Sequence, residues 1–255
     1  MELLLISSAA LLAAILTFFT GFGLGTLLLP VCALFMPVDQ AVALTAVVHL
    51  VNGICKFALV SRHTVWRIVI SFGLPAVAAA LAGAWLLHRL AVAAPLAHYS
   101  LGGHPFQVMP IKLLVGLLLG IFALLEIVPL FRRMAFPPRY LVVGGLASGF
   151  FGGLAGMQGA LRSAFLVRTG IGKEQFIATG AAIACLIDIT RLGVYLPAIR
   201  TASFDVGVVA AATVAAIAGA LVGSSLLNKV SMRRVERLVA ACLLALGAAL
   251  AAGLL

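Results

Sequence analysis

The chain has 255 residues, of which 64% are hydrophobic and 9% are charged, and its formal net charge is +10 at pH 7. Soluble domains average about 45–50% apolar and about 25% charged residues, so this composition excludes a water-soluble globular protein and predicts a polytopic membrane protein. A basic excess of this kind is typical of loops that face one side of a bilayer. We therefore expect contact with membrane lipid and no nucleic-acid partner.

Eight apolar runs follow one another along the chain, and two of them are too long for one membrane helix. The runs cover residues 3–36, 40–60, 65–88, 111–131, 140–169, 174–197, 204–228 and 235–255. About 20 helical residues cross the hydrocarbon, which fits every run except the first and the fifth. No basic segment precedes the first run, so we expect it to remain in the mature protein.

The two halves of the chain repeat one pattern. A shift of 135 residues places Gly21 on Gly156, and each half contains one long interrupted run followed by three runs of ordinary length. We therefore predict a first transmembrane repeat at 1–131, a linker at 132–139 and a second transmembrane repeat at 140–255.

The basic residues indicate how the chain crosses the membrane. All of them except Lys56, Arg162 and Arg191 divide 6 against 8 between the two sides if each long run crosses once, and 3 against 11 if each long run is a re-entrant hairpin. The second division is the one expected when basic loops stay in the cytoplasm. It predicts an all-α multi-pass protein of the bacterial inner (plasma) membrane, with two inverted repeats. Each repeat would contain a re-entrant or broken helix hairpin and three transmembrane helices, with both termini and the loop at 89–110 on the periplasmic side and the linker in the cytoplasm.

Glycines interrupt the two long runs and predict two unwound corners at membrane depth. Backbone of this kind is tolerated only where it is buried in protein or lines a wet cavity, and the half-helix that follows presents free N–H groups to an anion. Paired interruptions mark the substrate site in inverted-repeat transporters. The glycines predicted to bind substrate are Gly21, Gly23 and Gly25 at the first corner and Gly156 and Gly159 at the second. Close helix packing is the alternative role for them.

The second corner also contains a polar side chain and a cation. Gln158 and Arg162 are four residues apart, so they share one helix face. A charge at this depth is costly and is usually functional or paired, and we predict that both residues bind substrate. The alternative is that Arg162 extends to the cytoplasmic interface.

A polar stripe runs along the second apolar run, at Thr45, His49, Asn52 and Lys56. These positions share one helix face, which must face the interior of the bundle because lipid would not accept it. We predict that Asn52 and Lys56 bind substrate and that His49 acts in proton coupling or gating. Lys56 lies near the cytoplasmic end, so extension to the interface is again the alternative.

The remaining intramembrane charges lie in the fourth and sixth runs. Arg191 occupies the place in the second repeat that Lys56 has in the first, and Asp188 precedes Arg191 by three residues. This pair is either structural or opens when an anion or proton arrives. We predict that Arg191 binds substrate and that Asp188 and Glu126 act in proton coupling or gating. Pairing with a nearby arginine is the alternative for Glu126.

Cysteines and histidines give no sign of a prosthetic group. The four cysteines lie in apolar runs without metal or redox spacing, and the histidines lack ligand spacing. We expect no cofactor, no metal and no catalytic residue.

The glycine corners resemble the TauE/SafE family of sulfite-exporter-like permeases, which have a G-x-G-G-G-x4-P-type motif early in each of two repeats. Gly21-Phe22-Gly23-Leu24-Gly25 and Pro30 match the first copy, with Leu24 in place of one glycine. In the second copy Gly156 and Gly159 match, whereas Gln158, Ala160 and Phe165 depart from it. The resemblance extends over nearly the whole chain, including residues 39–45 and the basic linker. It implies transport of sulfur-containing or other small organic anions, such as sulfite or sulfonates.

We therefore expect a non-enzymatic secondary transporter that binds a small anion between the two corners and works by alternating access. An anion channel is the first alternative, since inverted halves are compatible with it. An intramembrane enzyme or assembly factor is the second, although the sequence contains no catalytic dyad or ligand cluster that it would need. A homodimer is compatible with the sequence.

Overall fold

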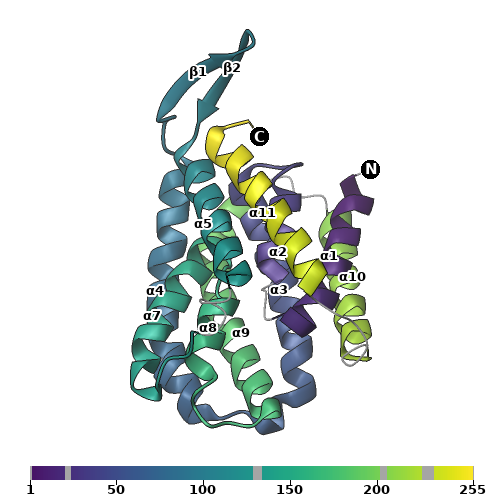
Figure 1. Ribbon diagram of the computed structural model, residues 1–255, viewed down its shortest axis with the longest axis vertical. Helices are drawn as coiled ribbons and strands as arrows, with labels where there is room; N and C mark the ends of the chain where they lie inside the picture. Colours follow the sequence, from purple (N-terminus) through teal and green to yellow (C-terminus); the bar gives the residue numbers. More distant parts are fainter. Residues whose placement is uncertain (1, 21–23, 129–133, 202–205, 226–232, 255) are drawn as a thin grey trace.

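The computed structural model describes residues 2–20, 24–128, 134–201, 206–225 and 233–254. Helices dominate this part of the chain, as the composition predicts, and a two-stranded hairpin follows α4 (Figure 1). In the first half the elements are α1 (Glu2–Thr20), α2 (Leu24–Cys32), α3 (Val38–Val60), η1 (Ser61–His63), α4 (Trp66–Ala91), β1 (Ala97–Leu101), β2 (His104–Val108) and α5 (Pro110–Ile127). In the second half they are η2 (Pro138–Tyr140), α7 (Leu141–Ala155), α8 (Gly159–Leu166), α9 (Lys173–Thr201), α10 (Val206–Ser225) and α11 (Arg233–Ala252).

Three segments of the described chain are long and apolar enough to cross a membrane: Val38–His63, Trp66–Ala91 and Lys173–Leu196. Shorter apolar helices occupy α1, α5, α10 and α11. Trp66 and Trp85 are both exposed on α4, and 19 residues of helix place them about 28 Å apart. That separation is close to the thickness of the hydrocarbon, at whose two interfaces tryptophan is enriched.

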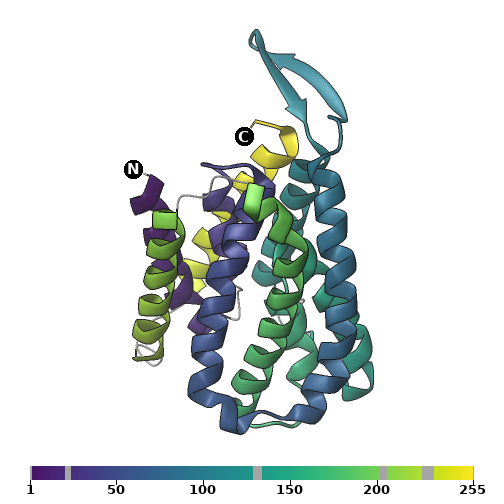
Figure 2. The ribbon, with the colours of Figure 1, turned by 180° about the vertical axis from the view of Figure 1, so that it is seen from behind.

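The first halves of the two broken helices enter the molecule from opposite ends. In Figure 1, α1 runs from the end that bears the β-hairpin towards the middle, whereas α7 runs towards the middle from the other end. The helices α3 and α9 then run along the molecule in opposite directions, side by side, as Figure 2 shows from behind. The start of α1 and the end of α11 both lie towards the hairpin end.

Each half of the chain packs mainly against the other half. Extensive contacts join α4 to α7 and, in the corresponding places, α10 to α1. Further cross-half contacts join α3 to α9 and α5 to α11, and also α4 to α9 and, in the corresponding places, α10 to α3. The described helices therefore interleave the two predicted repeats.

Small residues bring α4 and α7 into backbone contact. Gly145, Gly149 and Gly153 recur every fourth residue on α7, and a Cβ on any of them would collide with a carbonyl of α4. The carbonyls belong to Phe72, Ala76 and Ala80. Membrane helices associate closely through faces of this kind because no side chain separates the backbones.

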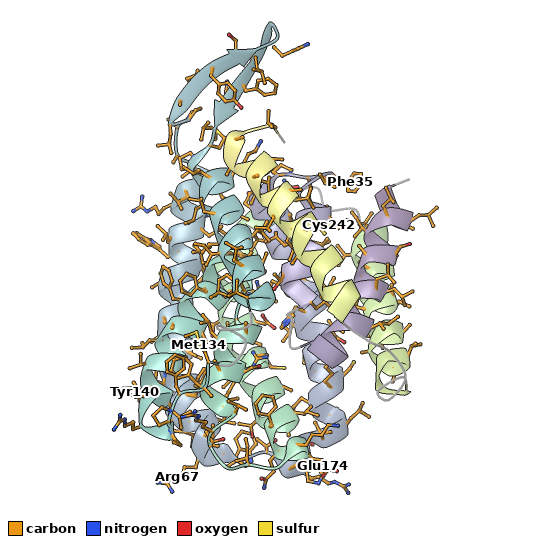
Figure 3. The ribbon with its side chains drawn as sticks, viewed as in Figure 1. Phe35, Arg67, Met134, Tyr140, Glu174 and Cys242 are labelled. Atoms are coloured by element: carbon orange, nitrogen blue, oxygen red, sulfur yellow. The ribbon has the colours of Figure 1, made fainter. Side chains whose placement is uncertain are left out.

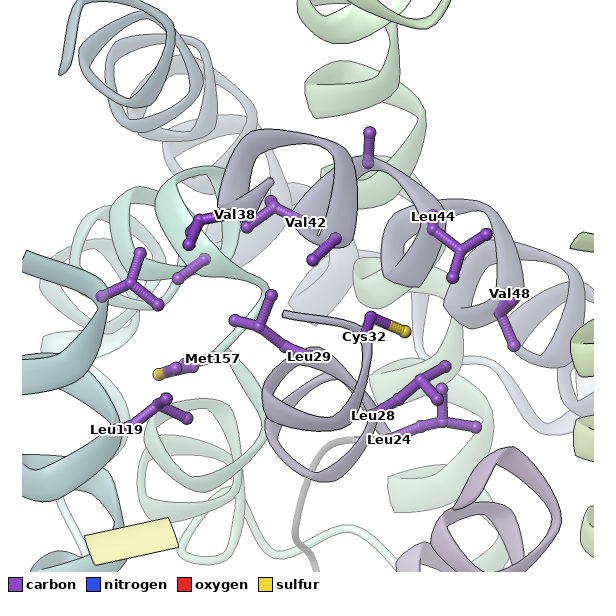
Figure 4. Close-up of a cluster of buried hydrophobic side chains, with 14 of the residues drawn as sticks. Leu24, Leu28, Leu29, Cys32, Val38, Val42, Leu44, Val48, Leu119 and Met157 are labelled. Atoms are coloured by element: carbon purple, nitrogen blue, oxygen red, sulfur yellow. The ribbon is translucent and has the colours of Figure 1, made fainter. Parts of the chain in front are cut away.

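A large apolar cluster surrounds α2 at the centre of the molecule. Leu24, Leu28 and Leu29 of α2 are fully buried, and they lie among side chains of α3, α5 and the second corner (Figure 4). Met157 and Leu119 are two of these neighbours. The short helix is thus held by packing over its whole length.

The segment expected to be a loop at 89–110 is different in the structure. α4 continues to Ala91, and residues 97–108 form an antiparallel hairpin in which Ala97 pairs with Val108 and Leu101 with His104. Gly102 and Gly103 both have positive φ (60° and 83°), as the two central residues of a type I′ hairpin turn do. The Tyr99 hydroxyl donates to the Ala252 carbonyl at 2.6 Å and ties the hairpin to α11.

Charged side chains gather at the end opposite the hairpin, where Arg67, Tyr140 and Glu174 are labelled in Figure 3. His63 Nε2 lies 2.8 Å from Glu174 Oε2 there, and joins the connection after α3 to the start of α9. The described part of the predicted linker packs on α8, since Phe136 stacks on Phe165 with ring centroids 4.4 Å apart.

Candidate anion site at the helix breaks

The second corner is a glycine-terminated helix break. α7 ends at Ala155, and Gly156 adopts φ 75° and ψ 11°, the left-handed conformation that glycine adopts without strain. Its N–H donates to the Gly152 carbonyl at 2.9 Å. α8 begins at Gly159, so the chain is interrupted where the sequence predicts.

The first corner has the same order of elements. α1 ends at Thr20 and α2 begins at Leu24, with Pro30 inside the second segment. Gly21 and Gly23 lie outside the described residues. Gly25 is buried in α2, and a Cβ on it would lie 3.0 Å from the Gly156 carbonyl oxygen. The structure therefore brings the second corner against the start of α2.

Asp188 on α9 is the centre of a buried polar network that joins both halves. Its Oδ2 lies 2.5 Å from His49 Nδ1 on α3. Its Oδ1 accepts from Arg191 Nε at 3.0 Å and from Gln158 Nε2 at 3.4 Å. Asp188, Arg191 and Gln158 are fully buried. The Asp188–Arg191 pair is thus closed in the structure, and Asp188 has two further partners from other elements.

Gln158 extends the network to the next cation. Its Oε1 accepts from Arg162 Nη1 at 3.0 Å, so these residues share a helix face as predicted. The Ser148 hydroxyl of α7 donates to the Gln158 carbonyl at 3.2 Å and fixes the backbone of the corner. Arg162 is half-buried, and its Nε lies 3.4 Å from the place of a Cβ on Gly180 of α9.

Several buried side-chain atoms of the described residues make no hydrogen bond, and two of them belong to predicted site residues. Arg191 Nη1 is the first, and it lies 2.7 Å from the place that a Cβ on Gly156 would occupy. Asn52 Oδ1 on α3 is the second, and its side chain is 2% exposed. A buried donor without a partner costs about 1–3 kcal/mol. The corner therefore offers a cationic donor that an anionic ligand would satisfy.

Other predicted residues lie at the edge of this network or beyond it. Lys56 is half-buried on α3, two turns past His49. Glu126 belongs to α5, but its side chain lies outside the described residues. Gly159 is buried at the first position of α8.

Sequence reasoning missed two residues that support the site, Ser148 and Tyr195. Tyr195 is buried on α9, and its hydroxyl donates to the Gly153 carbonyl of α7. Its spacing of four residues from Arg191 and seven from Asp188 places it on the same helix face, which is a signal the sequence contains. Within the described residues, no three potential ligands come together as a metal site.

Interrupted helices, a buried charge network at their meeting point and apolar membrane-length helices are features that polytopic membrane transporters share. The chain belongs to the sulfite exporter TauE/SafE family, whose model matches residues 6–250. No curated protein matches the chain. Membrane location, transport and a permease architecture follow for this protein from the family and the helices together.

Proposed function

We propose that this protein is a secondary transporter for small sulfur-containing or organic anions, such as sulfite or sulfonates. One observation carries the proposal: the fully buried Arg191 directs an unpartnered Nη1 at the second helix break. Charged side chains at membrane depth are costly and rare, and those that occur are usually functional.

The anion would bind where the start of α8 meets Arg191. The first N–H groups of a helix have no intrahelical partner and favour negative charge. Gly156 and Gly159 bring backbone close to the bound anion because neither has a side chain. Gln158 at the break and Asn52 on α3, both buried, would add amide groups.

The start of α2 would face the same anion from the other half. Gly25 lies against the Gly156 carbonyl, so the two breaks are neighbours. Gly21 and Gly23 complete the first corner in this proposal. The short helices α2 and α8 occupy corresponding positions in the two halves. This correspondence supports binding of the anion between the halves rather than within one half.

Access would alternate by movement of interleaved helix groups. The opposite directions of α1 and α7, and of α3 and α9, support two inverted repeats with two re-entrant hairpins. The tight backbone contact of α4 with α7 supports one rigid group built from both halves. In the bacterial inner membrane, the hairpin end with both termini would face the periplasm and the basic end the cytoplasm.

The Asp188–His49 pair is our candidate for coupling to a proton, with Glu126 as a further site. The pair joins α3 to α9, which belong to different halves, so a proton on it would alter the contact between them. Protonation of a buried histidine beside a carboxylate changes the local charge, and such a change can shift a protein between two conformations.

Thermal stabilisation and counterflow test the proposal. Purified protein would be heated with sulfite, thiosulfate, taurine, sulfoacetate and simple carboxylates, and reconstituted protein tested for exchange of the same anions. We expect stabilisation by at least one sulfur oxyanion, and loss of it in Arg191→Lys but not in Arg67→Lys, an exposed control. If no anion stabilises the wild type and none is exchanged, the proposal is wrong. Steady conductance without saturable exchange would indicate a channel instead.

A further inference from the structure

Thr45 on α3 has a buried hydroxyl that makes no hydrogen bond. The residue is 1% exposed, and its Oγ1 has no partner at hydrogen-bonding geometry. Threonine hydroxyls inside helices can donate to the carbonyl four residues earlier, and those of Thr190 and Thr213 do so here, at 2.7 Å each. The neighbour of the Thr45 hydroxyl on α2 is the Cys32 thiol, which is only a weak hydrogen-bonding group. The hydroxyl of Thr45 is therefore left with a donor that nothing strong accepts.

The contacts of Thr45 place it where the two helix breaks meet. Two other described hydroxyls, of Ser7 on α1 and of Thr64 after η1, are also buried without a partner. Of the three residues, Thr45 is the one with a described contact at the breaks. Its Cγ2 lies 3.7 Å from the place that a Cβ on Gly25 would occupy, and the same place is 3.0 Å from the Gly156 carbonyl oxygen. Thr45 thus borders the point where the start of α2 meets the second corner.

Arg191 reaches the same level from the other half of the chain. The helices α3 and α9 run antiparallel (Figure 2), and His49 meets Asp188 between them. Thr45 precedes His49 by four residues, or about 6 Å of helix. Arg191 follows Asp188 by three residues, which is about 4.5 Å in the same direction because the helices are antiparallel. One turn beyond the His49–Asp188 pair, two unpartnered groups therefore lie at one level on neighbouring helices.

No side chain of the intervening residues separates these two groups. The contacts run from Thr45 through Gly25 and Gly156 to Arg191, whose Nη1 lies 2.7 Å from the place of a Cβ on Gly156. The short threonine side chain and Arg191 Nη1 make no hydrogen bond to each other. A ligand of a few atoms with acceptors on two sides would satisfy both donors at once.

We propose that the Thr45 hydroxyl binds the transported anion and donates to one of its oxygens, while Arg191 Nη1 donates to another. This inference rests on the proposed transport function, and it defines the substrate as an oxyanion with at least two terminal oxygens. A hydroxyl suits this role because its proton rotates towards an acceptor and adds no charge that must be balanced when the site is empty. The bound anion would join α3 to α9, which belong to different halves.

Thr45→Val tests the proposal because it removes the hydroxyl and keeps a β-branched side chain of similar size. Equilibrium binding of sulfite and of methanesulfonate to the purified protein would be measured, together with the melting temperature without anion. We expect the affinity for both anions to fall about tenfold or more, as for the loss of one hydrogen bond to a charged group. The melting temperature without anion should stay the same or rise, because a buried hydroxyl without a partner is destabilising and valine has none.

Two matched variants complete the test. Thr45→Ser keeps the hydroxyl and should bind both anions within about threefold of the wild-type affinity. Thr213→Val removes a hydroxyl that bonds within α10 and should leave the affinity unaltered.

The possible results separate this inference from the proposed function. If Thr45→Val binds both anions as the wild type does while Arg191→Lys does not bind them, the role of Thr45 is wrong and the proposed function stands. A fall in both the affinity and the melting temperature of Thr45→Val would show that the hydroxyl is structural, and would also overturn the inference. If the wild type binds neither anion, the proposed function fails and the role of Thr45 fails with it.

Discussion

Each of the two corners is a break between two helices, but the chemical surroundings of the two breaks differ. The first leads into α2, whose Leu24, Leu28 and Leu29 are packed in an apolar cluster (Figure 4). The second leads into α8, where Gln158 and Arg191 are buried in a charge network. Both halves thus contain a helix break, whereas the buried charge network lies beside the second break. We infer that the first corner supplies a rigid wall and that the second selects the anion.

The largest expected effect comes from removing the centre of the network. Asp188→Ala would leave Arg191 buried without its carboxylate, which typically costs about 3–5 kcal/mol. The measurement is the free energy of unfolding in lipid bicelles, with Glu174→Ala, an exposed acid, as the control. A loss below about 1 kcal/mol would show that the pair is not the buried ion pair described here.

Alanine at each corner compares the two breaks directly. Gly156→Ala forces a left-handed backbone on alanine, at a cost of about 1–3 kcal/mol, and places a methyl group 2.7 Å from Arg191 Nη1. We expect anion exchange to fall at least about tenfold, since 1.4 kcal/mol corresponds to that factor. Gly25→Ala meets the Gly156 carbonyl at 3.0 Å in a helical backbone and should cost less. Equal losses in the two variants would contradict the division of roles.

A third substitution makes the second corner resemble the first. Leu27 occupies the place in the first repeat that Arg162 has in the second, so Arg162→Leu removes the charge and keeps the repeat pattern. Because Arg162 is half-buried, we expect a change in stability of less than about 1 kcal/mol, as for most partly exposed sites. Exchange should still fall about tenfold. Unaltered exchange would remove Arg162 from the pathway.

The smallest effect is expected at the basic end of the molecule. His63 pairs with Glu174 at the surface, where the Glu174 side chain is 68% exposed. Exposed pairs contribute about 0–1 kcal/mol, so His63→Ala should leave melting temperature and exchange nearly unaltered. A large loss of exchange would indicate a gate at this end of the molecule and would contradict the assignment of the main functional residues to the corners.

The sequence predicted the parts of the site that depend on spacing along one element. Glycines in over-long apolar runs predicted both breaks, and the four-residue spacing predicted that Gln158 and Arg162 meet. The family resemblance was confirmed by the match over residues 6–250. Both predictions depend on local sequence patterns, which can be recognised without knowing how the helices pack.

Contacts between elements could not be predicted in the same way. The pairing of His49 with Asp188 needs α3 beside α9, and the role of Tyr195 needs α7 beside α9. The hairpin at 97–108 was also missed, because its strands have little apolar alternation and are mostly exposed. The pair of Asp188 with Arg191 follows from spacing on one helix, whereas the bonds of Asp188 to His49 and Gln158 were visible only in three dimensions.

The location of a bound anion tests the central claim most directly. Selenite has the shape and charge of sulfite and scatters anomalously, so its position can be found in crystals grown with it. We expect an anomalous peak within hydrogen-bonding distance of Arg191 Nη1 and the first N–H groups of α8. A peak found only away from both corners, at a selenite concentration that stabilises the protein, would contradict the account.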